Sequence, residues 1–147
     1  NKLLDLLKTA QDNEPTNASL YYAEGNVYLK FNDFEKAIAA YQKSAQIDPN
    51  YFWAYFSEGK AYYDQAVAIQ EQANMESDDN KYLALLDKLD KSLESSISPL
   101  EIAFSKADDQ ELKAYVAELL KNVYFRFRDK SEEYKANYEK YNSFLQK

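Results

Sequence analysis

The stretch YYAEGNVYLKFNDFEKAIAAYQKSAQIDPN, residues 21–50, decides the fold because it places a glycine inside a helical pattern. The chain has only two glycines, and Gly59 lies 34 residues after Gly25. Each glycine follows an aromatic residue by four positions and precedes another by three, and these offsets share one face of a helix. The flanking aromatics are Tyr21 and Tyr28 in the first copy and Tyr55 and Tyr62 in the second.

The second half of the stretch predicts another amphipathic helix. Asp33 is the natural N-cap of that helix, Asn32 lies in the turn before it, and Pro49 follows its end. The apolar residues at helical spacing are Phe34, Ala37, Ile38, Tyr41 and Ala45. Residues 21–50 therefore predict a helix–turn–helix unit that repeats every 34 residues.

This unit resembles a tetratricopeptide repeat, in which small residues lie where helices cross and a proline follows the second helix. The resemblance implies an all-α, right-handed α-α superhelix. It places Gly25 and Gly59 where the first helix of a repeat is crowded by its partner, so that close packing offsets a helix-propensity cost of about 1 kcal/mol. The alternative, glycine at a helix end, is less favoured because apolar periodicity continues to Leu29 and Tyr63.

The resemblance covers nearly the whole chain as a single domain of about three repeats and a leading half repeat. Residues 1–17 are expected to be the second helix of a preceding repeat, 18–51 one repeat, 52–113 an extended repeat, and 114–147 a C-terminal repeat and cap. In this alignment Lys121 replaces the glycine of the third repeat.

The middle repeat is expected to extend into a long helical hairpin. Residues 64–80 continue the first helix, and the polar tip lies near residues 77–80. Helices lengthened by about 14 residues would project roughly 20 Å beyond the stack. Replacing residues 65–93 with a short turn should therefore leave the flanking repeats folded. The stripe along the second helix comprises Tyr82, Leu86, Leu89, Leu93 and Ile97.

Pro99 allows two interpretations of the second hairpin helix. Ser98 could cap a new helix that starts at Pro99, or Pro99 could kink a continuing helix through a lost hydrogen bond to Ser95. The resemblance favours the kink. Either Ala103 or Ala107 could then fill the small-residue position.

The amino-acid composition favours an all-helical fold and argues against two classes of function. Two glycines, three prolines and 16% aromatic residues favour helices over short strands. A net charge of −7 repels phosphate backbones, so we expect no nucleic-acid ligand. No run approaches 18 apolar residues, so we expect no membrane insertion.

The residues needed for common catalytic and metal sites are scarce. There is no histidine or cysteine, no glycine-rich phosphate loop, and the neighbours Lys91 and Ser92 would point to different sides of a helix. The acidic cluster Glu76, Asp78 and Asp79 lacks the alternating ligands and the glycine of a calcium loop, so helix capping is favoured. We therefore expect no enzyme, catalytic residue, cofactor or metal.

The resemblance implies that the first helices of the repeats line a concave groove. Aromatic residues on such a surface are typical of interaction hot spots. The alternative is that the hairpin folds back and covers them. The expected groove residues are Tyr22, Asn26, Leu29, Trp53, Phe56, Lys60, Tyr63, Tyr115, Leu119, Asn122 and Phe125.

One subfamily binds a C-terminal chaperone carboxylate with a clamp of lysines, asparagines and an arginine. This sequence keeps only Asn26 of that clamp. The other places hold Tyr22, Ser57, Tyr115 and Leu119, so chaperone-tail binding is not expected.

The leading hypothesis is a non-catalytic interaction module or scaffold that binds a protein or peptide segment in the groove. The alternatives are a structural or self-association domain that packs against its parent chain or another subunit, or an accessory domain of a larger envelope protein. The chain starts at Asn1 without a methionine or a leader, which favours a fragment of a longer protein. The extended middle repeat followed by VYFRFRD, residues 123–129, resembles the C-terminal end of certain bacterial multi-repeat proteins, which implies a periplasmic rather than a cytoplasmic location.

Overall fold

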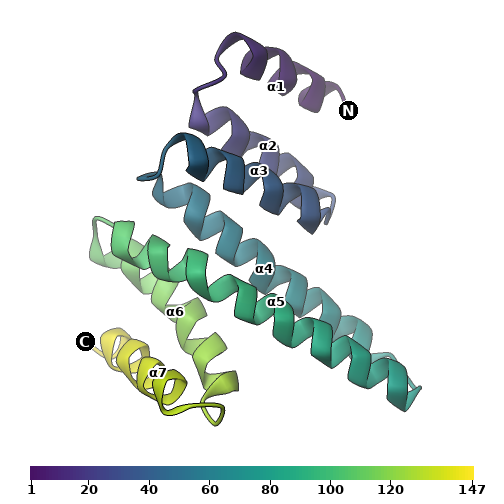
Figure 1. Ribbon diagram of the computed structural model, residues 1–147, viewed down its shortest axis with the longest axis vertical. Coiled ribbons are helices and arrows are strands. Elements are labelled where there is room, and N and C mark those ends of the chain that lie inside the picture. The colour runs from purple at the N-terminus through teal and green to yellow at the C-terminus, as the bar shows by residue number, and fades with distance from the viewer.

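The computed structural model describes all 147 residues as seven α-helices and no strand (Figure 1). Successive helices pack as the pairs α2–α3, α4–α5 and α6–α7, and α1 packs on α2. The predicted all-α, repeat-like solenoid is therefore confirmed. The helices are α1 (Lys2–Asn13), α2 (Ala18–Lys30), α3 (Phe34–Ile47), α4 (Phe52–Asn74), α5 (Asp79–Lys106), α6 (Gln110–Phe127) and α7 (Glu132–Leu145).

Side-chain caps start most of the helices. Asp33 accepts a hydrogen bond from the Lys36 amide at 3.2 Å, which confirms it as the N-cap of α3. Asn32 before it has φ of 57°, a left-handed conformation that asparagine tolerates better than most residues. Asp78 caps α5 in the same way, which is the capping role predicted for its cluster, and Asp109 caps α6.

Both glycines lie at crowded helix crossings. A Cβ on Gly25 would lie 2.6 Å from Cδ1 of Tyr41 on α3, and one on Gly59 would lie 2.6 Å from Cδ2 of Leu100 on α5. Tyr41 is fully buried, and its hydroxyl donates to Asn26 Oδ1 at 2.6 Å, so the ring has little freedom to move aside. The expected crossing role of the glycines is confirmed.

The middle repeat forms the predicted hairpin. Helices α4 and α5 have 23 and 28 residues, against 13 and 14 for α2 and α3. Figure 1 shows their outer halves (teal) projecting beyond the turn between α2 and α3. Because α5 contacts only α4 and α6, the hairpin does not fold back over α2.

Helix α5 continues through Pro99, so the interpretation of a new helix at Ser98 is wrong. Pro99 and the adjacent Leu100 are buried, and Leu100 is the residue that faces Gly59. The free energy gained by burying this segment between α4 and α6 compensates for the loss of the backbone hydrogen bond that proline cannot donate. Ala103 and Ala107 are both buried in the same core.

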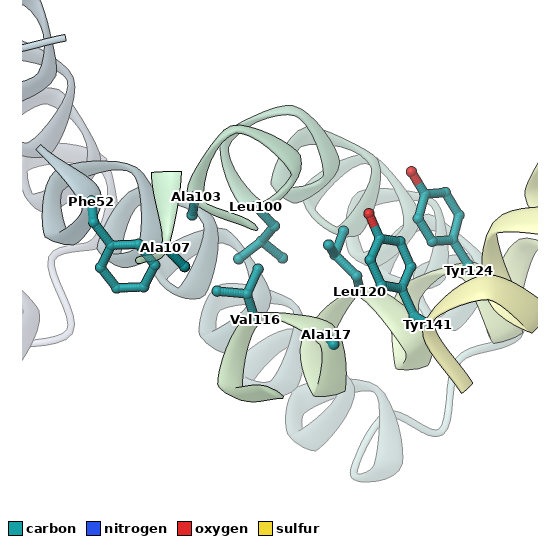
Figure 2. Close-up of a cluster of buried hydrophobic side chains, with 9 residues drawn as sticks. All are labelled: Phe52, Leu100, Ala103, Ala107, Val116, Ala117, Leu120, Tyr124 and Tyr141. Atoms are coloured by element: carbon teal, nitrogen blue, oxygen red, sulfur yellow. The ribbon is translucent and has the colours of Figure 1, made fainter. Parts of the chain in front are cut away.

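The main core joins the middle and last repeats. Figure 2 shows it running from Phe52 of α4, past Leu100 of α5, to Tyr141 of α7. The Tyr141 hydroxyl donates to the Glu101 carboxylate, and burial together with this carboxylate holds the pKa of Tyr141 well above its usual range. The remaining buried members are Ala103, Ala107, Val116, Ala117, Leu120 and Tyr124.

The third repeat differs from the expected alignment. Helix α6 begins at Gln110, four residues before the expected start at 114, because Asp109 caps it there. The Lys121 side chain is 26% exposed and pairs with Glu118 of its own helix. The small residue that is fully buried on α6 is Ala117, one turn earlier.

The base of the hairpin also belongs to the core. Ala66, Leu89 and Leu93 form a buried cluster with Val123 and Phe127 of α6. Two ion pairs also hold α5: Asp90 accepts from Arg126 Nε of α6, and Glu94 accepts from Lys130 Nζ in the turn after α6, both at 2.6 Å. Removing residues 65–93 would uncover two fully apolar side chains of α6, so the expectation that this whole segment is separable is wrong.

Gly25→Ala should lower the free energy of unfolding by about 1–3 kcal/mol, because the new methyl group overlaps the Tyr41 ring. The sign of this change in unfolding free energy is informative, because replacing glycine by alanine in an uncrowded helix interior stabilises a protein by about 1 kcal/mol. Urea unfolding followed by circular dichroism measures the difference. The control Lys121→Leu, at a partly exposed position, should be tolerated. A Gly25→Ala variant as stable as the parent would contradict the crossing.

Only the outer part of the hairpin should be separable. Of residues 71–85 only Ala73 is buried, and none belongs to a core cluster, so joining Gln70 to Leu86 through a short turn should leave the thermal melt nearly unchanged. By contrast, Leu89→Asp should destabilise by about 3–5 kcal/mol, because it leaves an unpaired charge in the core. Loss of the cooperative melt after the outer deletion would show that the tip supports the repeats.

Candidate protein-interaction surface

The first helices of the repeats form a row. Helix α2 contacts α4, and α4 contacts α6, although each also has a partner helix of its own. The Asn122 amide of α6 donates to the Tyr63 hydroxyl of α4 at 3.1 Å. Two of the expected groove residues, 59 positions apart in sequence, therefore touch.

The start of α4 presents an aromatic cluster. Trp53 is 41% exposed, and its ring packs edge-on against Phe52 and Phe56 with centroids 5.0 and 6.0 Å apart. Phe52 and Phe56 stack on each other at 5.7 Å, and Phe56 also packs against the main core. Trp53 is thus the solvent-facing member of the cluster, whereas Phe56 is half-buried support for it.

Helix α6 adds two more exposed aromatic side chains. Tyr115 is 57% exposed, and Phe125 is 47% exposed. Phe125 is held between the Arg128 guanidinium, 3.8 Å from its ring centroid, and the Tyr138 ring at 5.2 Å. Leu119, by contrast, packs partly against the main core.

The α2 residues are mostly used inside the repeat. Tyr22 packs against Tyr41 and Tyr51 at 5.9 and 5.6 Å between ring centroids, and Leu29 packs on the cluster around Tyr41. Asn26 already accepts the hydroxyl of Tyr41. The exposed aromatic surface therefore belongs chiefly to α4 and α6.

Two residues that support this surface were not predicted. Tyr51 ends the turn before α4, and Tyr138 lies on α7, a second helix that the resemblance excludes from the groove. The sequence does not single out these two residues, because they are 2 of 14 tyrosines in the chain. Only the packing distances identify them.

A small hollow of about 260 Å³ opens beside Tyr63 and Asn122, between α4, α5 and α6. Leu89 and Leu93 of the hairpin and Val67 of α4 supply apolar lining. Sequence reasoning missed the α5 contribution, because the stripe of that helix predicts only internal packing. The hollow extends the row of first helices toward the projecting hairpin.

Charges near the row are largely paired. Lys60, an expected groove residue, donates to Asp64 at 2.8 Å. On the neighbouring face, Glu58 accepts from the Gln42 side chain at 3.0 Å, and burial raises the pKa of the Glu58 carboxyl above its usual value. The row therefore offers aromatic and amide groups rather than a concentrated charge.

The side chains considered for catalysis do not converge. Ser92 is buried and donates to the Tyr62 carbonyl at 2.7 Å, whereas Lys91 is exposed and pairs with Asp87. No three His, Cys, Asp or Glu side chains are grouped so as to hold a metal ion. None of the seven helices has the length and apolarity needed to cross a membrane.

Comparison with known proteins agrees with this architecture. A family model described as TPR repeat matches residues 25–65. Within these residues the chain is similar to a tetratricopeptide repeat. Such repeats generally mediate protein–protein interaction and are typically non-catalytic, and their stacking forms extended concave binding surfaces.

The chain is also similar to the protein SGT1 homolog of Oryza sativa subsp. japonica. The two are 24% identical over 111 residues, which is 71% of this chain and 30% of that protein. The chain therefore spans less than a third of the length of this relative.

Trp53 fluorescence should report the state of the surface directly, since it is the only tryptophan. With 41% of the residue exposed, we expect quenching by acrylamide and emission to the red of a buried indole. Phe56→Ala should shift the emission further to the red, because one of the two supporting rings is lost. A blue, unquenchable Trp53 would show that another subunit or segment covers this surface.

Proposed function

We propose that this protein is an interaction module or scaffold whose row of first helices binds a peptide or an extended segment of a partner protein. One observation carries the proposal: α4 and α6 contact each other, and both expose large aromatic side chains, Trp53 on α4 and Tyr115 and Phe125 on α6. Exposed aromatics are the residues most enriched among interface hot spots.

The aromatic side chains are held in place before any partner arrives. Trp53 lies edge-on against two rings, and Phe125 lies between Arg128 and Tyr138. Side chains that are already ordered lose less conformational entropy on binding, so more of their contact energy contributes to affinity. This favours a role in binding over chance exposure.

The surface suits a segment of apolar or basic residues. The net charge of the chain is −7, and Lys60 on the row is already paired with Asp64. An acidic partner would therefore meet long-range repulsion, whereas a basic one would be steered toward the surface. The face of an aromatic ring attracts cations and also packs against apolar side chains.

Self-association is the second candidate. Helix α1 contacts only α2 and leaves Leu3 and Leu6 exposed on its other side. A dimer through this face would bury them. Sedimentation over a range of protein concentrations separates the two candidates. A self-associating chain gains mass as its own concentration rises, whereas a peptide-binding module needs no self-association.

Selection from a displayed peptide library tests the binding proposal. Peptides selected on the parent should bind Trp53→Ala and Tyr115→Ala about 2 kcal/mol more weakly, roughly 30-fold in Kd, as expected for hot spots. The control Tyr82→Ala removes an exposed aromatic from the hairpin and should leave binding unchanged. Thermal melts confirm that each variant is folded.

Two results would contradict the proposal. One is a selection that yields no saturable binder. The other is a set of peptides that bind Trp53→Ala and Tyr115→Ala as tightly as they bind the parent, which would place the binding surface elsewhere on the molecule.

A further inference from the structure

The projecting hairpin creates a second concave surface outside the row of first helices. We call it the notch: a hollow of about 680 Å³ between the α2–α3 turn and the outer half of α4. Leu29 and Phe34 line it from the first repeat, and Val67, Ala68 and Ile69 line it from α4. Figure 1 shows α4 continuing well past the turn between α2 and α3.

The notch exists because the two repeats differ in length. The inner half of α4 is covered by the first repeat, since Ala61 is buried in a cluster with Ala37, Ile38 and Tyr41. Helix α2 ends at Lys30 and α3 begins at Phe34, so the first repeat stops at the turn that lines the notch, and Val67, further along α4, is 47% exposed. The apolar side chains of α4 in the notch, Val67, Ala68 and Ile69, are therefore not covered by a helix of the first repeat.

The charge of the notch is one-sided. Its lining holds two carboxylates, Asp64 and Glu71, and no cationic side chain. Lys60 pairs with Asp64 from outside the lining, whereas exposed Glu71 makes no ion pair. The amides of Gln65 and Gln72 lie among the apolar side chains and add hydrogen-bonding groups.

We propose that the notch is a docking site for a cationic amphipathic segment of another protein, in which lysine or arginine side chains flank apolar ones. Its apolar side chains would cover Val67 and Ile69, and its cations would pair with Glu71. This complementarity is independent of the row of first helices, so the inference does not rest on the proposed function.

Charge argues against a second copy of this chain as the occupant. The tip of the hairpin, which exposes Met75 and Leu83, carries Glu76, Asp78 and Asp79. Inserting that tip into the notch would place its carboxylates near Glu71, and like charges brought together at an interface oppose association. The overall charge of −7 acts in the same direction.

A synthetic helical peptide with lysines and leucines at i, i+4 spacing serves as the probe. Its fluorescein-labelled form is titrated with the protein, and binding is followed by anisotropy. Glu71→Lys should raise Kd by at least about fivefold, as expected when a rim charge is reversed. Glu139→Lys, an exposed position on α7, gives the same net charge and should change Kd by less than about twofold.

A second pair of variants locates the probe. Ala68→Asp, which alters a residue that lines the notch but not the hollow beside Tyr63, should weaken binding, whereas Trp53→Ala should leave Kd within about twofold, since it lies outside the notch. Circular dichroism confirms that both variants remain folded. Sedimentation of the parent and Glu71→Lys gives the oligomeric state.

Four outcomes would overturn the proposal. They are the absence of saturable probe binding, equal weakening by Glu71→Lys and Glu139→Lys, loss of probe binding in Trp53→Ala, and a parent dimer that becomes monomeric when the notch is altered. The second would show attraction by net charge alone, the third binding in the row of first helices, and the fourth self-association.

Discussion

The close approach of paired helices at Gly25 and Gly59 is the constraint on which the rest of the structure depends. At each crossing a large side chain of the partner helix, Tyr41 or Leu100, occupies the space that a Cβ would need. Because the partner fills that space, it also fixes the axial register of its pair. Tyr41 then reaches Asn26, and Leu100 enters the core that joins the last two repeats. Residues distant from the glycines are thus positioned by them.

The length of the middle repeat is the second determinant of the structure. It has opposite effects on the packing toward the last repeat and toward the first. Toward α6, the hairpin gains neighbours: Leu89 and Leu93 are buried with Val123 and Phe127, and two ion pairs join α5 to α6 and to the turn that follows it. Toward α2 and α3, the same extension finds none and leaves Val67 exposed. In a solenoid each repeat is stabilised mainly by its neighbours, so a repeat longer than its neighbours leaves surface uncovered.

The proposed binding surface follows from the same geometry. Stacking of α4 against α6 brings Tyr63 to Asn122, and both helices expose aromatic side chains. The supporting rings come from elsewhere, since Phe52 belongs to the main core and Tyr138 to α7. Core packing and surface presentation therefore share residues, and a substitution such as Phe56→Ala would affect both.

The sequence by itself determined the helices, the 34-residue period and the cap at Asp33, because these depend on local propensity and spacing. The crossing role of both glycines followed from the resemblance of that period to a tetratricopeptide repeat. The sequence also identified Trp53, Tyr115 and Phe125 as residues off the packing face. Only the tertiary structure decided that α5 continues through Pro99, that Ala117 is the fully buried small residue of α6, and that the hairpin base is core. These outcomes depend on which surfaces of α4, α5 and α6 meet, and contacts between residues 30 to 60 positions apart have no local pattern that records them. The notch is the clearest case, since it arises only from the difference in length between two stacked repeats.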